Sequence, residues 1–273
     1  MIVGANGSGK TTAMEILCGL RLPTSGRAEF LGQPVVPGGA HRNWMGVQLQ
    51  VGGLPQRLRV REALKAAECL YRDAGDVDVI IDALGLRSRM SQMVDKLSGG
   101  WQRRLDIAIA CIGSPRLLVL DEPTSGLDPV ARTALWEFLR DRRSKGVAVL
   151  TSTHDLAEAE TYADRLLVLD EGRAILRGPV SEVLSAAGGD HRLRVLSGDP
   201  GCVSAIRAQG HTPLEAGSAI SVIGDSGGLT TLREKLERLR DAGEVKFSDV
   251  LLGSVRLEDV FAFAAASRKK ETT

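Results

Sequence analysis

A glycine-rich octapeptide that ends in lysine and threonine stands almost at the start of the chain, at Gly4–Thr11. It matches the pattern G-x-x-x-x-G-K-[ST] without a mismatch. In such a loop successive backbone N–H groups cradle a phosphate, and glycine permits the dihedral angles that this requires. Lys10 can neutralise β- and γ-phosphate oxygens, and Thr11 can bind Mg²⁺. The alternative, a plain glycine-rich turn, is weaker because helix periodicity follows at once.

Two carboxylates end an apolar run in the middle of the chain. The run Leu117–Leu120 leads into Asp121 and Glu122. An acid at the carboxyl end of a buried strand lies beside the phosphate loop of a doubly wound sheet. Asp121 could then hold Mg²⁺ through water, and Glu122 could act as a general base on the attacking water. Alone, this pattern more often marks a strand that ends in solvated acids; together with the loop it favours nucleotide chemistry.

Strands and helices that would bring these residues together are visible in the pattern. Short apolar runs at 117–120, 147–151 and 165–169 predict buried strands of a parallel sheet. Helical spacing follows the loop over 11–20 and returns over about 60–112, where Val60, Leu64, Ala67 and Leu70 recur at helix spacing. We therefore expect an α/β phosphate-loop domain over 1–187, with a helical subdomain at about 60–112.

A looser composition begins near residue 187, where Ala-Ala-Gly-Gly-Asp is typical of a linker. Beyond it, strand-like runs at 193–196 and 219–223 alternate with helical runs at 202–209 and 229–239. These predict a small C-terminal α+β domain over 188–273, with no chemical motif of its own.

Composition narrows the function classes. The 273 residues carry 35 Lys and Arg against 34 Asp and Glu, a formal charge of +1, whereas nucleic-acid binders usually show a basic excess. No nucleic-acid partner is therefore expected. No apolar run reaches the ~18–20 residues that span a bilayer. The four cysteines are scattered without a CxxC pair, and we interpret three of them as small buried thiols.

A third motif, Leu97-Ser98-Gly99-Gly100-Trp101, precedes an apolar helix, and its glycines leave backbone N–H groups accessible to an anion. With it, the set resembles the nucleotide-binding subunit of ATP-binding-cassette (ABC) transporters, whose signature peptide is similar to LSGGQ. The resemblance covers residues 1–185. Its motifs follow the family's order: the phosphate loop Gly4–Thr11, a glutamine loop at Val47–Gln50, the signature at Leu97–Trp101, the acidic strand end at Leu117–Glu122, a D-loop at Pro123–Asp128 and a histidine switch at Thr151–His154.

The resemblance implies a head-to-tail dimer, of identical or different cassettes, with each ATP between the phosphate loop of one subunit and the signature of the other. It implies catalytic roles for Glu122, His154 and Gln50, with His154 on the γ-phosphate. Mg²⁺ would be held or sensed by Thr11, Asp121 and Gln50. The residues expected to bind ATP are Gly4, Asn6, Gly7, Ser8, Gly9, Lys10, Thr11, Thr12, Ser98, Gly99, Gly100 and Asp128, the last coupling the two sites.

As a function, the resemblance implies an ATPase at the cytoplasmic face of the cell membrane that powers a separate transmembrane permease subunit. Export is expected because Ser254–Phe261 resembles the LEDVF-type tail of the daunorubicin-resistance-like exporters. A soluble cassette ATPase of translation or DNA repair is disfavoured because the chain has one cassette and no long coiled-coil insertion. A GTPase-like switch is disfavoured because neither Asn6 nor Asn43 is followed by lysine.

Two departures from the family pattern stand out. Trp101 replaces the glutamine of many members, but export-type relatives often differ here, so we expect activity to survive. Members also carry strands and an adenine-stacking aromatic residue ahead of the loop, where this chain has only Met1–Val3. We therefore expect a chain truncated at its start, which alone binds ATP weakly and aggregates. A truncated, inactive product is the alternative.

Overall fold

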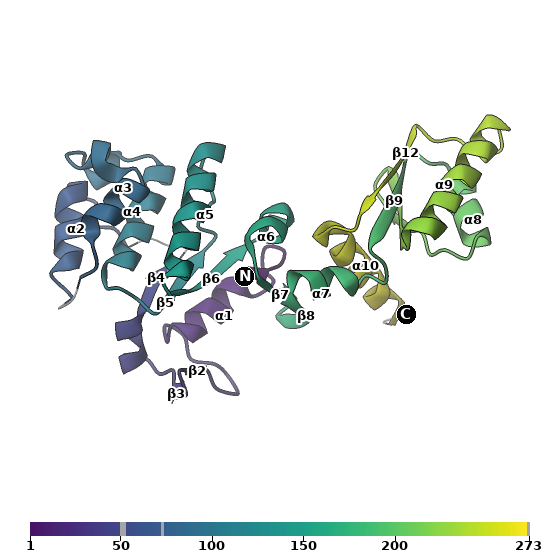
Figure 1. The fold of residues 1–273 in the computed structure, drawn as a ribbon. Coiled ribbons are helices and arrows are strands. Elements are labelled where there is room, and N and C mark those ends of the chain that lie inside the picture. Colours follow the sequence, from purple (N-terminus) through teal and green to yellow (C-terminus); the bar gives the residue numbers. More distant parts are fainter. Residues whose placement is uncertain (50–52, 72–73, 272–273) are drawn as a thin grey trace. The chain divides into compact units, whose positions relative to one another are not determined.

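The computed structural model describes residues 1–49, 53–71 and 74–271 and divides into two compact units (Figure 1). The first unit comprises Met1–Asp155 and Leu167–Ile175, and the second comprises Leu156–Leu166 and Leu176–Thr273. The domain boundary expected between 187 and 188 stays a prediction.

A six-stranded sheet forms the centre of the first unit. Its order is β4 (Met45–Gln48), β5 (Leu117–Asp121), β6 (Ala148–Thr153), β1 (Ile2–Val3), β7 (Arg165–Asp170) and β8 (Arg173–Pro179). Residues 165–166 of β7 and 176–179 of β8 belong to the second unit. Neighbours from β4 to β7 pair in parallel, so their carboxyl ends meet at one edge. Every residue of β5 is buried, because its apolar run is enclosed within the sheet. The expected α/β fold with a parallel sheet is confirmed.

Some helices of the first unit pack on this sheet, and others pack mainly on those helices. The helices of this unit are α1 (Lys10–Leu17), α2 (Val60–Glu68), α3 (Val77–Ala83), α4 (Gly99–Ile112) and α5 (Pro129–Ser144), with short 3₁₀ turns at Ala40–Trp44, Leu86–Arg89 and Val94–Lys96. A two-stranded ribbon, β2 (Glu29–Phe30) and β3 (Gln33–Pro34), follows α1. Met14 of α1 is fully buried against β5 residues Leu117 and Val119.

The prediction that helical spacing continues from Val60 to Leu70 is wrong at Leu70. Val60, Leu64 and Ala67 are buried as that spacing predicts, but α2 ends at Glu68 and Leu70 is 82% exposed. The Leu70 N–H bonds the carbonyl of Ala67, three residues back, so the chain tightens into a turn. That turn directs Leu70 away from the buried face of α2.

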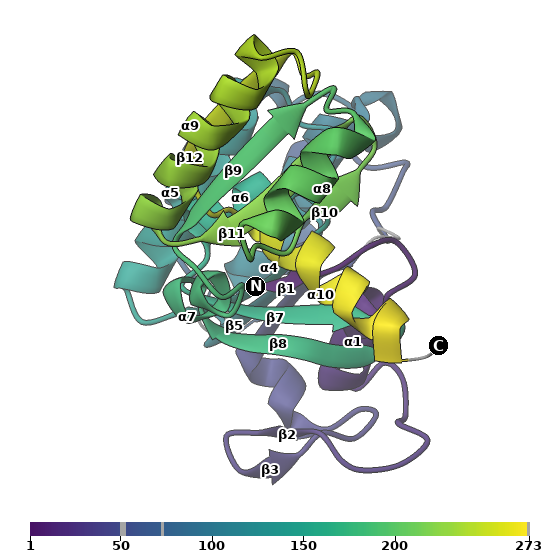
Figure 2. The ribbon, with the colours of Figure 1, turned by 90° about the vertical axis from the view of Figure 1, so that its right-hand side faces the viewer.

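The second unit is an α+β arrangement. Its antiparallel sheet runs β10 (Leu214–Ala216), β11 (Ala219–Gly224), β9 (His191–Leu196) and β12 (Asp249–Ser254). Helices α8 (Pro200–Ala208) and α9 (Ser226–Asp241) cover one face of it (Figures 1 and 2). Leu229, Leu232 and Leu236 form the buried stripe of α9 that their spacing predicts. The unit also contains α6 (Leu156–Tyr162), α7 (Val180–Ser185) and α10 (Leu257–Glu271).

The LEDVF-type segment anchors α10 to this sheet. Arg192 of β9 donates to both carboxylate oxygens of Asp259, at 3.1 and 2.9 Å, and both side chains are largely buried. Asp259 also accepts the backbone N–H of Arg256, and Glu160 of α6 accepts that of Leu257. The segment therefore has a structural role within the second unit.

Candidate functional site

The phosphate-loop candidate connects β1 to α1 and encloses a buried lysine. Gly7 and Gly9 have φ of 82° and 100°, which favour glycine, so the loop can turn sharply before the helix begins at Lys10. The Lys10 ammonium donates to the carbonyls of Gly4 and Ala5, at 2.8 and 3.0 Å. These bonds hold the ammonium beneath the loop, where a phosphate could reach it.

A cavity of about 380 Å³ opens over this loop. Its lining consists of Asn6, Gly7, Gly9, Lys10, Thr11, Thr12, Asp121 and Glu122. The sequence-predicted loop residues and both acids after β5 therefore meet in one place. Ser8 is buried, and its hydroxyl has no hydrogen-bond partner within the described part of the chain. Ser8 does not line the cavity itself.

Two oxygen ligands suited to a hard cation lie at the cavity wall. Thr11 donates its hydroxyl to Asp121 Oδ2 at 2.7 Å. Asp121 ends β5 and is almost completely buried. Hydroxyl and carboxylate oxygens are ligands that Mg²⁺ prefers, so the side chains of Thr11 and Asp121 fit this ion.

Glu122 follows directly and has an unusual backbone. Its φ is +47°, in the left-handed region that costs a non-glycine residue ~1–2 kcal/mol. Its carboxylate lies 3.0 Å from His154 Nδ1 and 4.0 Å from the Lys10 ammonium. His154 comes directly after β6, so the sheet brings together three residues that are far apart in sequence. A water beside this carboxylate would have a general base within reach.

The signature and D-loop candidates pack against each other, away from this cavity. A side chain added at Gly100 would place its Cβ 3.3 Å from the carbonyl oxygen of Gly126, so the two backbones approach closely. Ser98 occupies the N-cap of α4 but makes no side-chain capping bond, which leaves its hydroxyl available. Asp128 caps α5 by accepting the Ala131 N–H, and that bond holds its pKa below the usual value.

Trp101 occupies the first turn of α4 between two guanidinium groups. Arg104 lies 4.4 Å and Arg89 5.0 Å from the ring centroid, distances typical of cation–π contacts. Arg104 also lies 3.8 Å from Asp128. Arg104 therefore links the signature helix to the D-loop, and the Trp101 ring packs against its guanidinium group.

Sequence reasoning assigned no role to two polar residues beside the acids, although they lie within the motif ranges Thr151–His154 and Val47–Gln50. Ser152 of β6 is fully buried and bonds both Asp121 and Glu122. Gln48 of β4 is buried and donates to the carbonyl of Asp121 at 3.4 Å. The signal that could have indicated a role for Ser152 and Gln48 is a polar residue inside a buried strand, because such a side chain needs a hydrogen-bond partner. Gln50, expected to sense Mg²⁺, lies outside the described residues.

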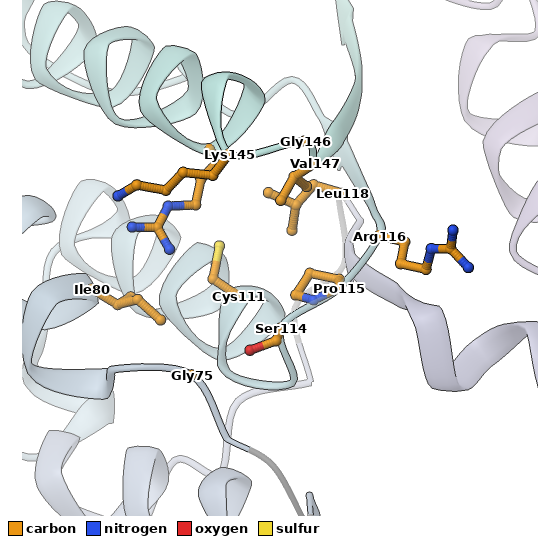
Figure 3. Close-up of a pocket in the computed structure, with 11 residues that line it drawn as sticks. Gly75, Ile80, Cys111, Ser114, Pro115, Arg116, Leu118, Lys145, Gly146 and Val147 are labelled. Atoms are coloured by element: carbon orange, nitrogen blue, oxygen red, sulfur yellow. The ribbon is translucent and has the colours of Figure 1, made fainter.

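A second cavity, of about 310 Å³, lies at the amino end of β5 (Figure 3). Cys111, Ser114 and Lys145 are among its lining residues, and the Arg116 side chain extends away from them in Figure 3. Its other cations are already paired, because Arg142 and Lys145 both donate to Asp141. Burial raises the pKa of the Cys111 thiol to about 12, so the thiolate is disfavoured. The Cys111 thiol in this cavity is therefore not activated as a nucleophile.

Comparison with known proteins points to one family. Residues 1–125 match the family model described as ABC transporter. The chain is 37% identical over 206 residues to the Nod factor export ATP-binding protein I of Rhizobium etli, covering 73% of this chain and 65% of that protein. It is 36% identical to the protein of the same name from Burkholderia orbicola, covering 73% of this chain and 67% of that one. The matched part of the chain thus spans about two thirds of the length of these relatives, and slightly less than two thirds of the first one.

Solved structures agree with the sequence relatives. An ATP-binding subunit of an ABC transporter superposes with a TM-score of 0.62 at 29% identity, covering 68% of this chain and 82% of that one. The cbiO1 protein of Clostridium perfringens, part of the ABC transporter complex cbiONQ, superposes with a TM-score of 0.57 at 26% identity, covering 67% and 79%. Within the described residues, no helix is long and apolar enough to cross a membrane.

Proposed function

The chain belongs to the ATP-binding family of ABC transporters, and from that premise we propose that it binds ATP with Mg²⁺ and hydrolyses it to power a separate membrane permease. ATPase activity is typical of this family. The observation that carries the proposal is the meeting of Lys10, Asp121 and Glu122 at the cavity over the phosphate loop, with His154 Nδ1 3.0 Å from the Glu122 carboxylate.

Each residue has a role that its surroundings support. Lys10 and the backbone amides of the loop would bind the β- and γ-phosphates, since both are donors held in place before the nucleotide arrives. Thr11 and Asp121 would hold Mg²⁺, which when bound neutralises phosphate charge. Glu122 would accept a proton from the attacking water, and His154 would orient that carboxylate or contact the γ-phosphate.

The remaining motif residues are proposed to act across a dimer. Ser98, Gly99 and Gly100 do not line the described cavity. Their hydroxyl and backbone amides, at the start of the long helix α4, would bind the γ-phosphate of a nucleotide held by a second cassette. Asp128 packs beside them through Arg104 and would couple the two sites.

The partner and direction of transport follow from the relatives. Two relatives are named as export ATP-binding proteins, so we propose an exporter whose permease is a different chain, with this chain bound at the cytoplasmic face of the membrane. In cells, the chain should sediment with the membrane fraction. Recovery only in the soluble fraction, in cells that express the permease, would contradict this placement.

Calorimetric titration with ATP tests the nucleotide site. Lys10→Met removes the ammonium and keeps most of the side-chain stem, so ATP affinity should fall roughly tenfold or more. Lys145→Met is the matched control, because Lys145 is an exposed lysine of the same unit that pairs with Asp141. Equal affinities of Lys10→Met and the parent chain would exclude this loop as the nucleotide site.

A further inference from the structure

We propose that Ser152 is a positioning residue that fixes the two acids after β5 relative to each other. The inference rests on the proposed ATPase function, in which Asp121 and Glu122 have different tasks. Ser152 has no part in the motif roles assigned above, and it does not line the described cavity over the phosphate loop.

The hydroxyl of Ser152 connects the two acids directly. It donates to Asp121 Oδ1 and accepts the backbone N–H of Glu122 at 2.9 Å. A serine hydroxyl offers one donor and two acceptor positions, so this geometry uses the donor and one acceptor. The bond to the carboxylate is charge-assisted and strengthens the bond that the same oxygen accepts.

Sheet register places this hydroxyl where it cannot be replaced by water. Ser152 pairs with Asp121 on β5 and with Ile2 on β1, the strand that leads into the phosphate loop. It is 0% exposed. Loss of the hydroxyl therefore removes the partner of the Glu122 N–H and the bond to Oδ1 of Asp121, at a position that solvent does not reach.

The backbone of Glu122 depends on that bond. Its φ of +47° is unfavourable for glutamate, and the N–H bond to Ser152 is a local interaction that holds it there. Relaxation of φ would move the carboxylate, which now lies 3.0 Å from His154 and 4.0 Å from Lys10. Asp121 would keep its bond from Thr11, so binding of the nucleotide should suffer less than turnover.

Ser152→Ala in the full chain is the first test, with steady-state phosphate release and fluorescent-ATP binding measured in parallel. We expect kcat to fall about 10- to 100-fold, because displacement of a catalytic group by an ångström has this effect, while the Kd for ATP stays within about threefold. Ser152→Thr keeps the hydroxyl and should recover most of kcat. Ser152→Cys keeps the size with a weak donor and should resemble Ser152→Ala.

Ser221→Ala is the matched control, because Ser221 is a buried serine of strand β11 in the other unit. A kcat for Ser152→Ala equal to that of Ser221→Ala, or a Kd that rises as much as kcat falls, would overturn the positioning role. If Ser152→Ala does not fold, Ser152→Cys decides, and full activity in that variant would also overturn it.

Hydrogen–deuterium exchange separates this inference from the ATPase proposal. The peptide that includes the Glu122 amide should exchange faster in Ser152→Ala than in the parent, whether or not the chain hydrolyses ATP. Faster exchange in Ser152→Ala than in a parent chain that shows no ATPase activity would contradict the proposed function and still support the bond from the Glu122 N–H to Ser152. Unchanged exchange would overturn the inference itself.

Discussion

Asp106, on the signature helix α4, has a carboxylate that burial destabilises. Burial raises its pKa from 3.8 to about 6, only partly opposed by Arg103. A raised pKa means that the folded chain binds the proton more tightly than the unfolded chain. The ionised carboxylate therefore lowers the free energy of unfolding by its full amount above pH 6, and this loss of stability disappears as the pH falls toward 4. Two pKa units correspond to roughly 3 kcal/mol, and partial solvent screening reduces this to about 1–2 kcal/mol.

Asp106→Asn removes the charge at nearly constant shape and should therefore stabilise the first unit by about 1–2 kcal/mol at pH 8. The gain should shrink between pH 7 and pH 4. Urea unfolding followed by tryptophan fluorescence reports on this unit alone, because Trp44, Trp101 and Trp136 all belong to it.

Asp141→Asn is the control of opposite sign. Lys145 holds the pKa of this exposed carboxyl below its usual value, so its charge contributes stability at neutral pH that is lost in acid. The substitution should lower the urea midpoint at pH 8 and not at low pH. A midpoint for Asp106→Asn that falls at pH 8, or that rises equally at pH 4.5 and pH 8, would refute the reasoning.

Three further predictions follow from named contacts. In a Glu122→Gln background, Ser98→Arg should abolish ATP-dependent dimerisation in light scattering while monomer binding persists; a stable ATP-bound dimer would place the contact elsewhere. Burial raises the pKa of Cys18 and Cys202 to about 11 and that of Cys111 to about 12. A thiol reagent should therefore label the exposed Cys69 first in the native chain. Equal labelling rates at all four cysteines would contradict this. Asp259→Ala should destabilise the second unit by about 3 kcal/mol, because it leaves Arg192 largely buried and unpaired. Calorimetric unfolding compares this variant with the double variant Arg192→Leu/Asp259→Leu, which should recover stability. A double variant as unstable as Asp259→Ala would refute the pairing argument.

Local patterns in the sequence were sufficient to predict the glycine-rich turn at Gly4–Thr11, the buried strand over 117–120 and the helix over 229–239. Each depends on residues close together in the chain: glycines at a turn, an apolar run, or helical spacing. The same reasoning included Leu70 in the helical spacing that begins at Val60, because spacing alone does not show that α2 ends at Glu68.

Contacts set by strand register could not be predicted in this way. Ser152 meets Asp121 and Glu122 only because β5 and β6 pair as Asp121 with Ser152, across some 30 residues of chain. The pairing of Arg192 with Asp259 spans a greater separation. The left-handed backbone of Glu122 is likewise invisible in its residue type, because glutamate rarely adopts it.

Steady-state phosphate release by Glu122→Gln, beside ATP binding by the same variant, tests the central claim most directly. Glutamine keeps the shape of Glu122 and cannot accept the proton, so turnover should fall roughly 10²- to 10⁴-fold while ATP binding persists. A parent chain that releases phosphate, together with a Glu122→Gln variant whose turnover stays within about threefold of it, would remove Glu122 from the mechanism.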